Sequence, residues 1–232
     1  MRVFAISDLH LDCTNSKPMN IFAPVWNNQT EKILESAKNL GICDEDVLLI
    51  PGDLSWAMKL ENARQDLEFL TKLPGKKIIL KGNHDYWWSS LTKVKQALPI
   101  GVFPIQNDAI KFGDYIFCGT RGWEHNEGKN YTKEDEAIFN REILRLELSI
   151  NQAKKLQTNN EEIICLMHFP PFNFKREDSA FTKLIEEAGI KKVVYGHIHT
   201  NFKGRDAVIK KNGVSYFLTS CDFLENNITE IN

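Results

Sequence analysis

Short apolar runs recur along this 232-residue chain, and most of them are followed by an acidic residue, a glycine or a histidine. The runs with strand-like composition cover residues 2–7, 47–51, 77–81, 115–120, 163–167 and 192–195. Several are apolar throughout, which is typical of strands buried on both faces. Helix-like stretches lie between them, so the alternation predicts an α/β fold with a mixed sheet.

The predicted helices are bounded by capping residues, glycines and prolines. They cover residues 30–40, about 55–73, 91–98, 132–153 and about 179–188. We expect Thr30 to cap the first helix, whereas Thr132 and Asp135 match a capping box at the start of the longest. Near the end of the chain, Asn212-Gly213 predicts a β-hairpin.

No repeat, low-complexity segment or linker divides the chain, so we predict one domain over residues 1–232. Within it, we expect residues 120–160, a loop plus the long helix, to contribute to substrate selection. The formal net charge is −2. Without a basic excess, nothing indicates a duplex-DNA partner.

The cysteines are scattered and lack the C-x-x-C spacing of a metal or redox motif. No apolar run has the length of a membrane span, and the first residues do not resemble an export signal. We therefore expect free thiols and a cytoplasmic location.

Polar residues gather directly after the predicted strands, and five of the six histidines are among them. These residues are Asp8, His10, Asp53, Asn83, His84, Asp85, His168, His197 and His199. A single histidine or Gly-Asp pair in such a place is an ordinary turn residue. Because the carboxyl ends of parallel strands meet at one edge of a sheet, we expect the whole set to converge there.

Converging carboxylate, imidazole and amide groups favour divalent cations such as Mn²⁺, Fe²⁺ or Zn²⁺. Seven candidate ligands are too many for one four-coordinate ion, and idle buried ligands are costly. The ligands are Asp8, His10, Asp53, Asn83, His168, His197 and His199. We therefore predict two divalent ions, Mn²⁺ in the first place and Fe or Zn²⁺ as alternatives, in an arrangement suited to displacement at phosphorus.

The ordered motifs Asp8-x-His10, Gly52-Asp53, Gly82-Asn83-His84-Asp85, His168 and Gly196-His197-x-His199 resemble those of the binuclear calcineurin-like metallophosphoesterases. The resemblance covers residues 7–199. It implies a four-layer α/β/β/α sandwich with mixed sheets and with both metals at one edge.

The resemblance also implies roles for these residues. One metal would be held by Asp8, His10, Asp53 and His199, and the other by Asp53 as the bridging ligand, Asn83, His168 and His197. A hydroxide bridging the metals would attack the phosphorus in line. His84 would contact the phosphate and protonate the leaving group.

The chain departs from the family's protein phosphatases after the Gly-Asp motif. The stretch GDLSWAM has Trp56 in place of an aspartate that orients the catalytic histidine, and Ala57 in place of a phosphate-binding arginine. We therefore expect no phosphoprotein substrate. Asp85, which follows His84, is a further candidate catalytic residue. Either the Asp85 carboxylate or a backbone carbonyl would be the partner that orients the His84 ring.

Three further segments bear on substrate choice. In the loop 120–131, Arg121 is a candidate for binding a second phosphate or a carboxylate of the substrate, and Trp123 is a candidate for stacking on a ring. The equal alternative is that this segment is an ordinary surface loop. For residues 86–88, packing beneath the site is favoured over stacking on a base. The simplest interpretation of the loop 172–178 is a solvated surface segment. The sequence Phe-Pro-Pro-Phe after His168 predicts a stiff loop that forms one wall of the site.

The prediction is a metal-dependent phosphoesterase that hydrolyses a phosphomonoester or phosphodiester of a small or nucleotide-like substrate. A nuclease is disfavoured by the near-neutral charge, because binding to a nucleic acid backbone uses several basic contacts. The alternative is a non-catalytic scaffold with the same fold. Retention of all seven ligands and His84 favours the enzyme.

Overall fold

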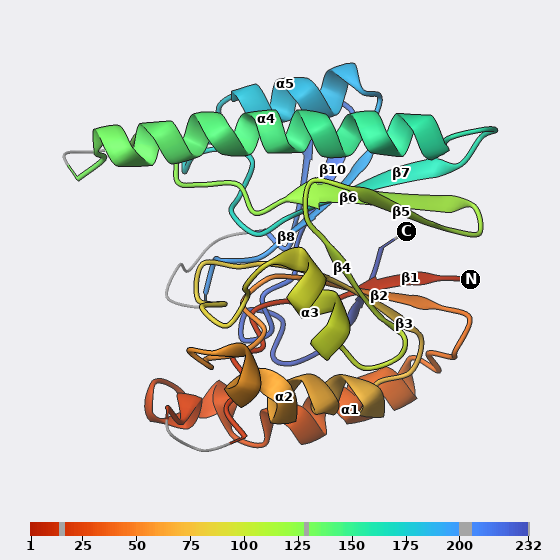
Figure 1. Cartoon of the computed structure of the whole chain (residues 1–232), viewed down its shortest axis with the longest axis vertical. Helices are drawn as coiled ribbons and strands as arrows, with labels where there is room; N and C mark the ends of the chain where they lie inside the picture. Colours follow the sequence, from red (N-terminus) through yellow and green to blue (C-terminus); the bar gives the residue numbers. More distant parts are fainter. Residues whose placement is uncertain (14–16, 128–129, 200–205, 232) are drawn as a thin grey trace.

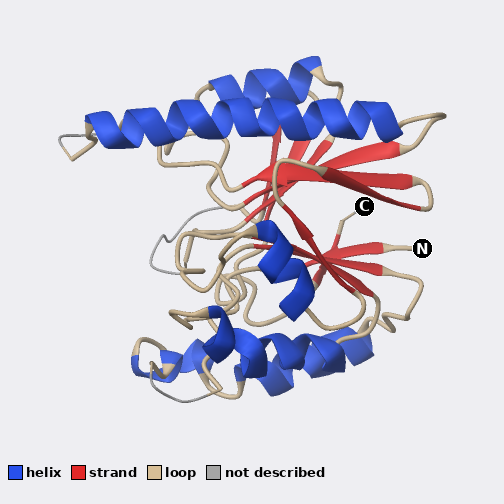
Figure 2. Ribbon diagram, viewed as in Figure 1, coloured by secondary structure: helices blue, strands red, loops and turns tan. Residues whose placement is uncertain are grey.

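A computed structural model describes residues 1–13, 17–127, 130–199 and 206–231. Two β-sheets lie face to face, and helices cover the outer face of each (Figure 1). The layers therefore follow the order helix, sheet, sheet, helix, as Figure 2 shows by colour. The predicted α/β sandwich with mixed sheets is confirmed.

The first sheet has the strand order β11-β1-β2-β3-β4. Its strands are β1 (Val3–Ala5), β2 (Val47–Pro51), β3 (Lys76–Leu80), β4 (Val102–Ile105) and β11 (Thr229–Glu230). The first four are parallel, and β11 pairs with β1 in the antiparallel sense.

The second sheet has the strand order β5-β6-β7-β8-β10-β9. Its strands are β5 (Ala109–Phe112), β6 (Tyr115–Thr120), β7 (Glu162–Met167), β8 (Lys192–Tyr195), β9 (Val208–Lys211) and β10 (Val214–Leu218). The four central strands are parallel, and the two outer strands are antiparallel to their neighbours.

Helices cover the sheets in two groups. The α-helices are α1 (Gln29–Asn39), α2 (Leu60–Phe69), α3 (Leu91–Ala97), α4 (Lys133–Leu156) and α5 (Ala180–Glu187). Side chains of α1, α2 and α3 share a buried apolar cluster with the first sheet, and those of α4 and α5 share one with the second. No helix among the described residues is long and apolar enough to cross a membrane.

The strands are apolar throughout because both of their faces are buried. In β2, Leu49 faces the second sheet and packs in the cluster that contains Ile164 and Val194. Its neighbours Leu48 and Ile50 face the helices. Because the central strands are also parallel, their carboxyl ends emerge together at one edge of each sheet.

The two sheets are joined at the edge where the polar strand ends gather. Ser7 and Ser220 form an isolated parallel bridge between the segments after β1 and β10. The N–H of Asp8 donates to the carbonyl of Gly52 at 3.0 Å, and the N–H of Gly196 donates to the carbonyl of His168 at 3.1 Å. These bonds bring loops that are distant in sequence into one edge.

Several predicted element ends are confirmed. Thr132 caps α4 with Asp135 in a complete capping box. Asn212 and Gly213 both have positive φ in the turn between β9 and β10, as this hairpin type requires. The five cysteines are free.

Other predicted boundaries are wrong. The Thr30 hydroxyl donates to the Glu31 carboxylate and does not cap α1, which begins one residue earlier. The expected helix from residue 55 begins only at Leu60, because Ser55 is bonded to other loops of the site. The short strands β4, β5 and β11 were not predicted. Two residues of the loop 120–131, 128 and 129, lie outside the described part of the chain.

Candidate metal centre

Four of the polar strand-end residues adopt a backbone conformation that side chains other than glycine rarely take. The φ angles are 55° at Asp8, 44° at His10, 53° at Asp53 and 69° at His197. Such angles persist only where surrounding bonds impose them, and they concentrate at functional sites. The N–H of His10, for example, is held by the carbonyl of Asp53 at 2.9 Å.

Asp8 is fully buried at this edge. Its carboxylate accepts hydrogen bonds from the N–H of His197 and from the hydroxyls of Ser7 and Ser220, at 2.5 to 3.0 Å. Burial raises the pKa of Asp8 to about 6, although His199 and the hydrogen bonds oppose the rise. Ionising this carboxyl group is costly unless a positive charge faces it.

Asp53 has one carboxylate oxygen bonded and one without a partner in the described chain. Its Oδ1 accepts from the N–H of His84 at 2.8 Å. Its Oδ2 is buried, makes no hydrogen bond there, and lies 3.8 Å from His10 Nε2 and 3.5 Å from His168 Nε2. Burial and the nearby Asp8 raise the pKa of Asp53 well above its usual value. The unpaired oxygen sits between two histidines, as a bridging ligand would.

Asn83 lies between His168 and His197. Its Oδ1 is 2.6 Å from His168 Nε2 and 3.0 Å from His197 Nδ1. Burial keeps the pKa of His168 well below its usual value, so the ring is neutral. Its Nδ1 donates to the Pro51 carbonyl at 3.1 Å, so its Nε2 bears a lone pair that faces the amide oxygen. A cation would relieve this meeting of two acceptors.

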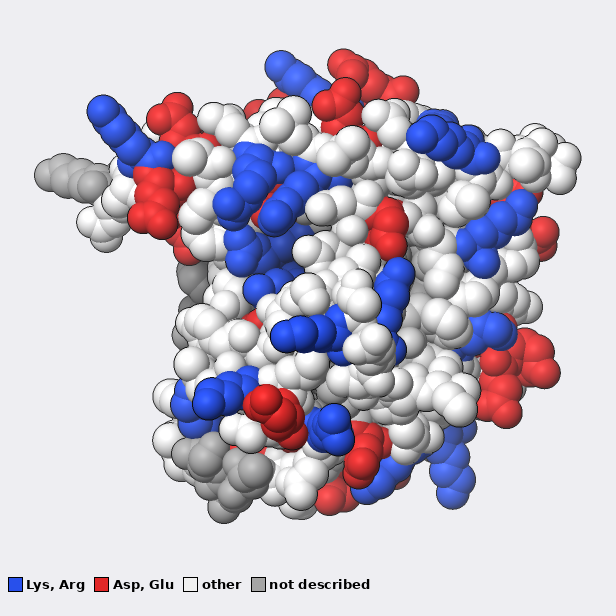
Figure 3. Space-filling model, viewed as in Figure 1, with Lys and Arg blue, Asp and Glu red and all other residues white. Residues whose placement is uncertain are grey.

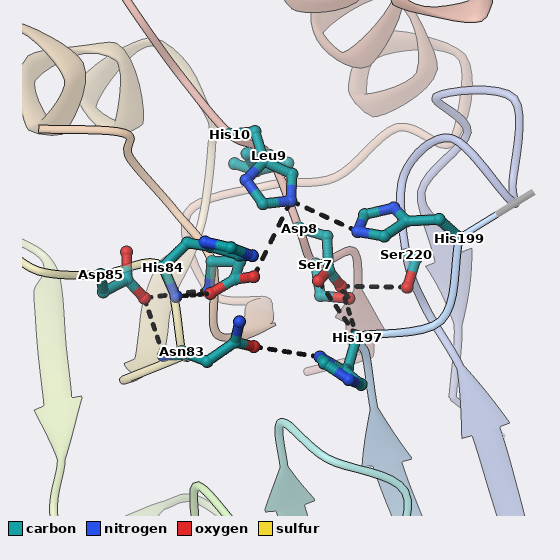
Figure 4. Close-up of polar contacts among 12 residues, drawn as sticks. Ser7, Asp8, Leu9, His10, Asn83, His84, Asp85, His197, His199 and Ser220 are labelled. Carbon is teal, nitrogen blue, oxygen red and sulfur yellow. Dashed lines mark hydrogen bonds and ion pairs between the residues drawn. The ribbon is translucent and has the colours of Figure 1, made fainter. Parts of the chain in front are cut away.

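His10 and His199 face one another on the other side of Asp8. Their Nε2 atoms are 3.4 Å apart, and the Nδ1 of His10 is buried without a partner among the described residues. The Nδ1 of His199 is 3.0 Å from Asp222 Oδ1, a carboxylate contact that typically orients metal-binding histidines. Figure 4 shows the rings of His10 and His199 turned toward each other, and likewise the side chains of Asn83 and His197.

The structure thus brings all seven predicted ligands to one edge. Two overlapping groups have ligand atoms that lie within 4.8 Å of one another: Asp8, His10 and His199, and Asp8, Asp53 and His168. Asp8 is common to both groups, whereas the bridging role was predicted for Asp53. The unpaired Asp53 Oδ2 nevertheless reaches toward a histidine of each group. The donor set fits divalent cations that prefer nitrogen and oxygen.

Two glycines of the motifs allow this close approach. A side chain at Gly82 would collide with the carboxylate and N–H of Asp53, and one at Gly196 would collide with the carboxylate of Asp8. The Gly-Asn and Gly-His pairs therefore let the backbone pack against the buried acids. The glycines at these two positions are therefore needed for close packing as well as for turn formation.

Asp85 supports the loops and does not partner His84. Its carboxylate is fully buried and accepts from four backbone N–H groups and the indole of Trp87, at 2.7 to 3.2 Å. The backbone donors are Asp53, Leu54, Ser55 and Gly82. The expected contact with the His84 ring is wrong, because both oxygens are engaged elsewhere and Nδ1 of His84 is buried with no partner in the described ranges.

Trp56 occupies the place of the missing aspartate and orients His84 by packing. Its ring lies 4.6 Å from that of His84 and is stacked on His10 at 4.8 Å. The indole N–H donates to the sulfur of Met19 at 3.1 Å, which fixes the ring. Burial, with His199 and Lys17, lowers the pKa of His84. The ring therefore needs a nearby negative charge to hold a proton near neutral pH.

Arg121 and Trp123 lie beside the centre and are packed together. The guanidinium carbon of Arg121 is 4.5 Å from the centroid of the Trp123 ring, and the indole N–H donates to Asp135 at 3.1 Å. Trp123 and Phe169 line a pocket of about 360 Å³ that also borders His197. Phe169 belongs to the predicted Phe-Pro-Pro-Phe wall.

The aromatic segment 86–88 packs beneath the site through its two tryptophans, as the sequence analysis favoured. Trp87 and Trp88 are buried and donate to Asp85 and Gln106. Only Tyr86 of this segment is exposed. In the loop 172–178, Arg176 is an exposed side chain paired with Asp206 at 3.0 Å.

Sequence reasoning missed the residues that hold the ligands in place. Asp222 and Ser220 follow β10, a central strand of the second sheet, and contact His199 and Asp8. Ser7 precedes Asp8 directly. The rule that located the ligands, polar residues after a parallel strand, would have found Ser220 and Asp222 as well.

Metal affinity should fall as the pH decreases. Below about pH 6, a cation must displace a proton from Asp8, and Asp53 adds to the effect because burial raises its pKa well above the usual value. Burial lowers the pKa of His199, but Asp222 and Asp8 outweigh it and raise that pKa, so His199 adds to the effect. Mn²⁺ titrations at pH 5 to 8 in buffers of different ionisation enthalpy should show proton release and weaker binding at low pH. Affinity independent of pH would contradict this.

Asp222 should contribute to affinity although it is not itself a predicted ligand. Because it orients His199, Asp222→Asn should weaken Mn²⁺ binding by about 10–100-fold. Asp178→Asn, which removes an exposed carboxylate paired with Lys211, is the matched control and should leave binding unchanged. Equal affinities for the two variants would exclude an orienting role. Calorimetric titration of the metal-free proteins measures both.

Comparison with solved structures shows the same fold at low sequence identity. TT1561 of Thermus thermophilus aligns with a TM-score of 0.63 at 14% identity, over 100% of this chain and 98% of that one. The phosphopantetheinyl hydrolase PptH from Mycobacterium tuberculosis aligns at 0.52 and 14% identity, over 94% and 88%. The calcineurin-like phosphoesterase YfkN from Bacillus subtilis aligns at 0.52 and 13% identity, over 95% and 81%.

A search of curated protein sequences finds no match. The family model for calcineurin-like phosphoesterases, in contrast, matches residues 1–201. This match contains every motif that forms the buried edge described above. The chain belongs to the calcineurin-like phosphoesterase family.

Proposed function

We propose that this protein is a metal-dependent phosphoesterase that hydrolyses a phosphomonoester or phosphodiester bond of a small or nucleotide-like substrate. The observation that carries the proposal is the buried Oδ2 of Asp53, unpaired within the described chain, between His10 and His168. Two divalent cations, when bound, lower the pKa of a water molecule and neutralise phosphate charge. The proposed ion is Mn²⁺, with Fe or Zn²⁺ as alternatives.

The residues of the chain divide the remaining work. Asp8, His10, Asp53 and His199 would hold one ion, and Asp53, Asn83, His168 and His197 the other. Buried carboxylates and neutral imidazoles are suited to this because the ions supply the charge that burial otherwise opposes. The hydrogen bonds of Ser7, Ser220 and Asp222 fix the ligand orientations.

His84 is the proposed general acid and contacts the phosphate. Its backbone N–H is tied to Asp53 and its ring rests against Trp56, so the imidazole is positioned at the centre without a carboxylate partner among the described residues. An anionic phosphate would raise its pKa and so keep a proton on the ring. Protonating the leaving oxygen would contribute about 10²–10⁴-fold to the rate.

The 360 Å³ pocket beside His197 is the proposed site for the organic part of the substrate. Its walls include the aromatic rings of Trp123, Tyr131, Phe169 and Phe174. A planar or apolar group can pack there while the phosphate lies at the metals. Residues 120–160 would therefore take part in substrate selection. We further propose that residues 1–232 form one domain.

The remaining proposals concern partners and location. With a net charge of −2, we propose no nucleic acid partner. Five free thiols support a reducing compartment, and we propose the cytoplasm.

The test of the proposed function is metal-dependent turnover. Protein reconstituted with Mn²⁺ is assayed with p-nitrophenyl phosphate and bis(p-nitrophenyl) phosphate. We expect hydrolysis of at least one, loss of activity on chelation, and recovery when Mn²⁺ is restored. No turnover of either with Mn²⁺, Fe²⁺ or Zn²⁺ would favour the non-catalytic scaffold.

His84→Asn should separate catalysis from metal binding. Loss of the general acid should lower kcat by about 10²–10⁴-fold, whereas metal content should not change because the ring is not a proposed ligand. Tyr86→Phe, two residues away and exposed, should retain both activity and metals. Elemental analysis of the same samples decides the assignment: a His84→Asn protein that has lost metal would contradict it.

A further inference from the structure

A second pocket, separate from the aromatic one, contains four basic side chains. It has a volume of about 240 Å³ and lies between the ends of β3 and β6 and the helix α4. Its basic residues are Lys81, Arg121, Arg141 and Arg145, and its one acidic residue is Glu142. Four positive groups and one negative group give a formal net charge of +3. Figure 3 shows basic side chains gathered below α4 on this face.

Glu142 holds this group together but neutralises only part of it. The carboxylate is buried, accepts from Arg145 at 2.6 Å and from the Thr120 hydroxyl at 2.5 Å, and so is engaged at both oxygens. Arg121 and Arg141 lie 3.9 and 4.0 Å from it, beyond hydrogen-bond distance. Their donors are therefore not consumed by the single carboxylate.

The polar atoms of Arg121 are also incompletely satisfied. Among the described residues its Nε is buried and has no hydrogen-bond partner. One face of the guanidinium is covered by Trp123, which fixes the plane of the group. Placing Arg121 beside Lys81, Arg141 and Arg145, with Glu142 as the one acidic residue of the pocket, costs free energy because like charges repel one another. Basic groups brought together at such a cost are compensated when an anion binds among them.

The basic pocket adjoins the metal centre directly. Lys81 stands two residues before Asn83 in the loop after β3. The carbonyl of Arg121 accepts from the N–H groups of His168 and Phe169 at 3.1 and 2.9 Å. An anion in this pocket is thus held by the same loops that carry the metal ligands. Lys81 is also the basic residue nearest in sequence to the predicted ligand Asn83.

We propose that this basic pocket binds a second phosphate group of the substrate, one that is not cleaved. The inference rests on the proposed function and narrows its substrate class to compounds with at least two phosphate groups, such as nucleoside bisphosphates. Guanidinium groups suit this role because they donate in pairs to phosphate oxygens. The aromatic pocket, which Trp123 also lines, would hold the organic part of the substrate.

Binding is measured first on metal-free protein, by calorimetry with inorganic pyrophosphate. Without metals the centre lacks the cations to which a phosphate would bind, so pyrophosphate binding reports on the basic pocket. Arg141→Gln removes an exposed cation that makes no hydrogen bond within the described chain, so its folding should be unaffected. We expect it to weaken binding by about tenfold. Lys154→Gln, near the other end of α4, is the charge-matched control and should bind as the unaltered protein.

The second measurement is inhibition of chromogenic substrate turnover in the Mn²⁺ enzyme. Thymidine 3′,5′-bisphosphate should inhibit at least about tenfold more strongly than thymidine 5′-monophosphate. That ratio should approach one in Arg141→Gln and stay unchanged in Lys154→Gln. Equal inhibition by the two compounds, or an Arg141→Gln protein that binds pyrophosphate normally, would overturn the second-phosphate site while leaving the phosphoesterase proposal intact. If the unaltered protein binds pyrophosphate as expected but its Mn²⁺ form hydrolyses no chromogenic substrate, the proposed function is rejected instead.

Discussion

The burial of two carboxylates side by side is the constraint on which the rest of this structure depends. Asp8 and Asp53 are each almost completely inaccessible, and burial raises the pKa of both. Ionising both without compensation would be prohibitive, since each charge is desolvated and repels the other. A pair of divalent cations would supply the missing charge. His10 and His168 would be available as further ligands because burial lowers their pKa values and keeps their rings neutral.

The fold serves this arrangement at one edge of two packed sheets. Strands buried on both faces carry the ligands to their carboxyl ends, and bonds between the loops hold four ligands at positive φ. Gly82 and Gly196 admit the acids where any larger residue would collide with them. Asp85 gathers five N–H groups beneath the ligand loops. Backbone strain at the centre is thus sustained by a surrounding network of hydrogen bonds.

The gathering of these polar residues at one edge could be predicted from the sequence, but the packing around them could not. The convergence of Asp8, His10 and Asn83 was predictable because polar residues follow several strands whose carboxyl ends meet at one edge. The role of Trp56 was not, because packing against His84 depends on the way three separate loops meet. Similarly, the helix expected from residue 55 was overridden by tertiary bonds to that residue, and the two-residue strand β11 has no periodicity to detect. The pattern of apolar runs and caps was therefore enough to predict the architecture. The side-chain contacts around the centre depend on residues far apart in the sequence.

The most direct measurement is the number and position of metal ions in reconstituted crystals, determined by anomalous diffraction at the absorption edge of Mn. Two ions per chain are expected, about 3.5–4 Å apart, with Asp53 reaching both and His84 bound to neither. A single ion, or two ions located away from Asp8 and Asp53, would contradict the binuclear centre.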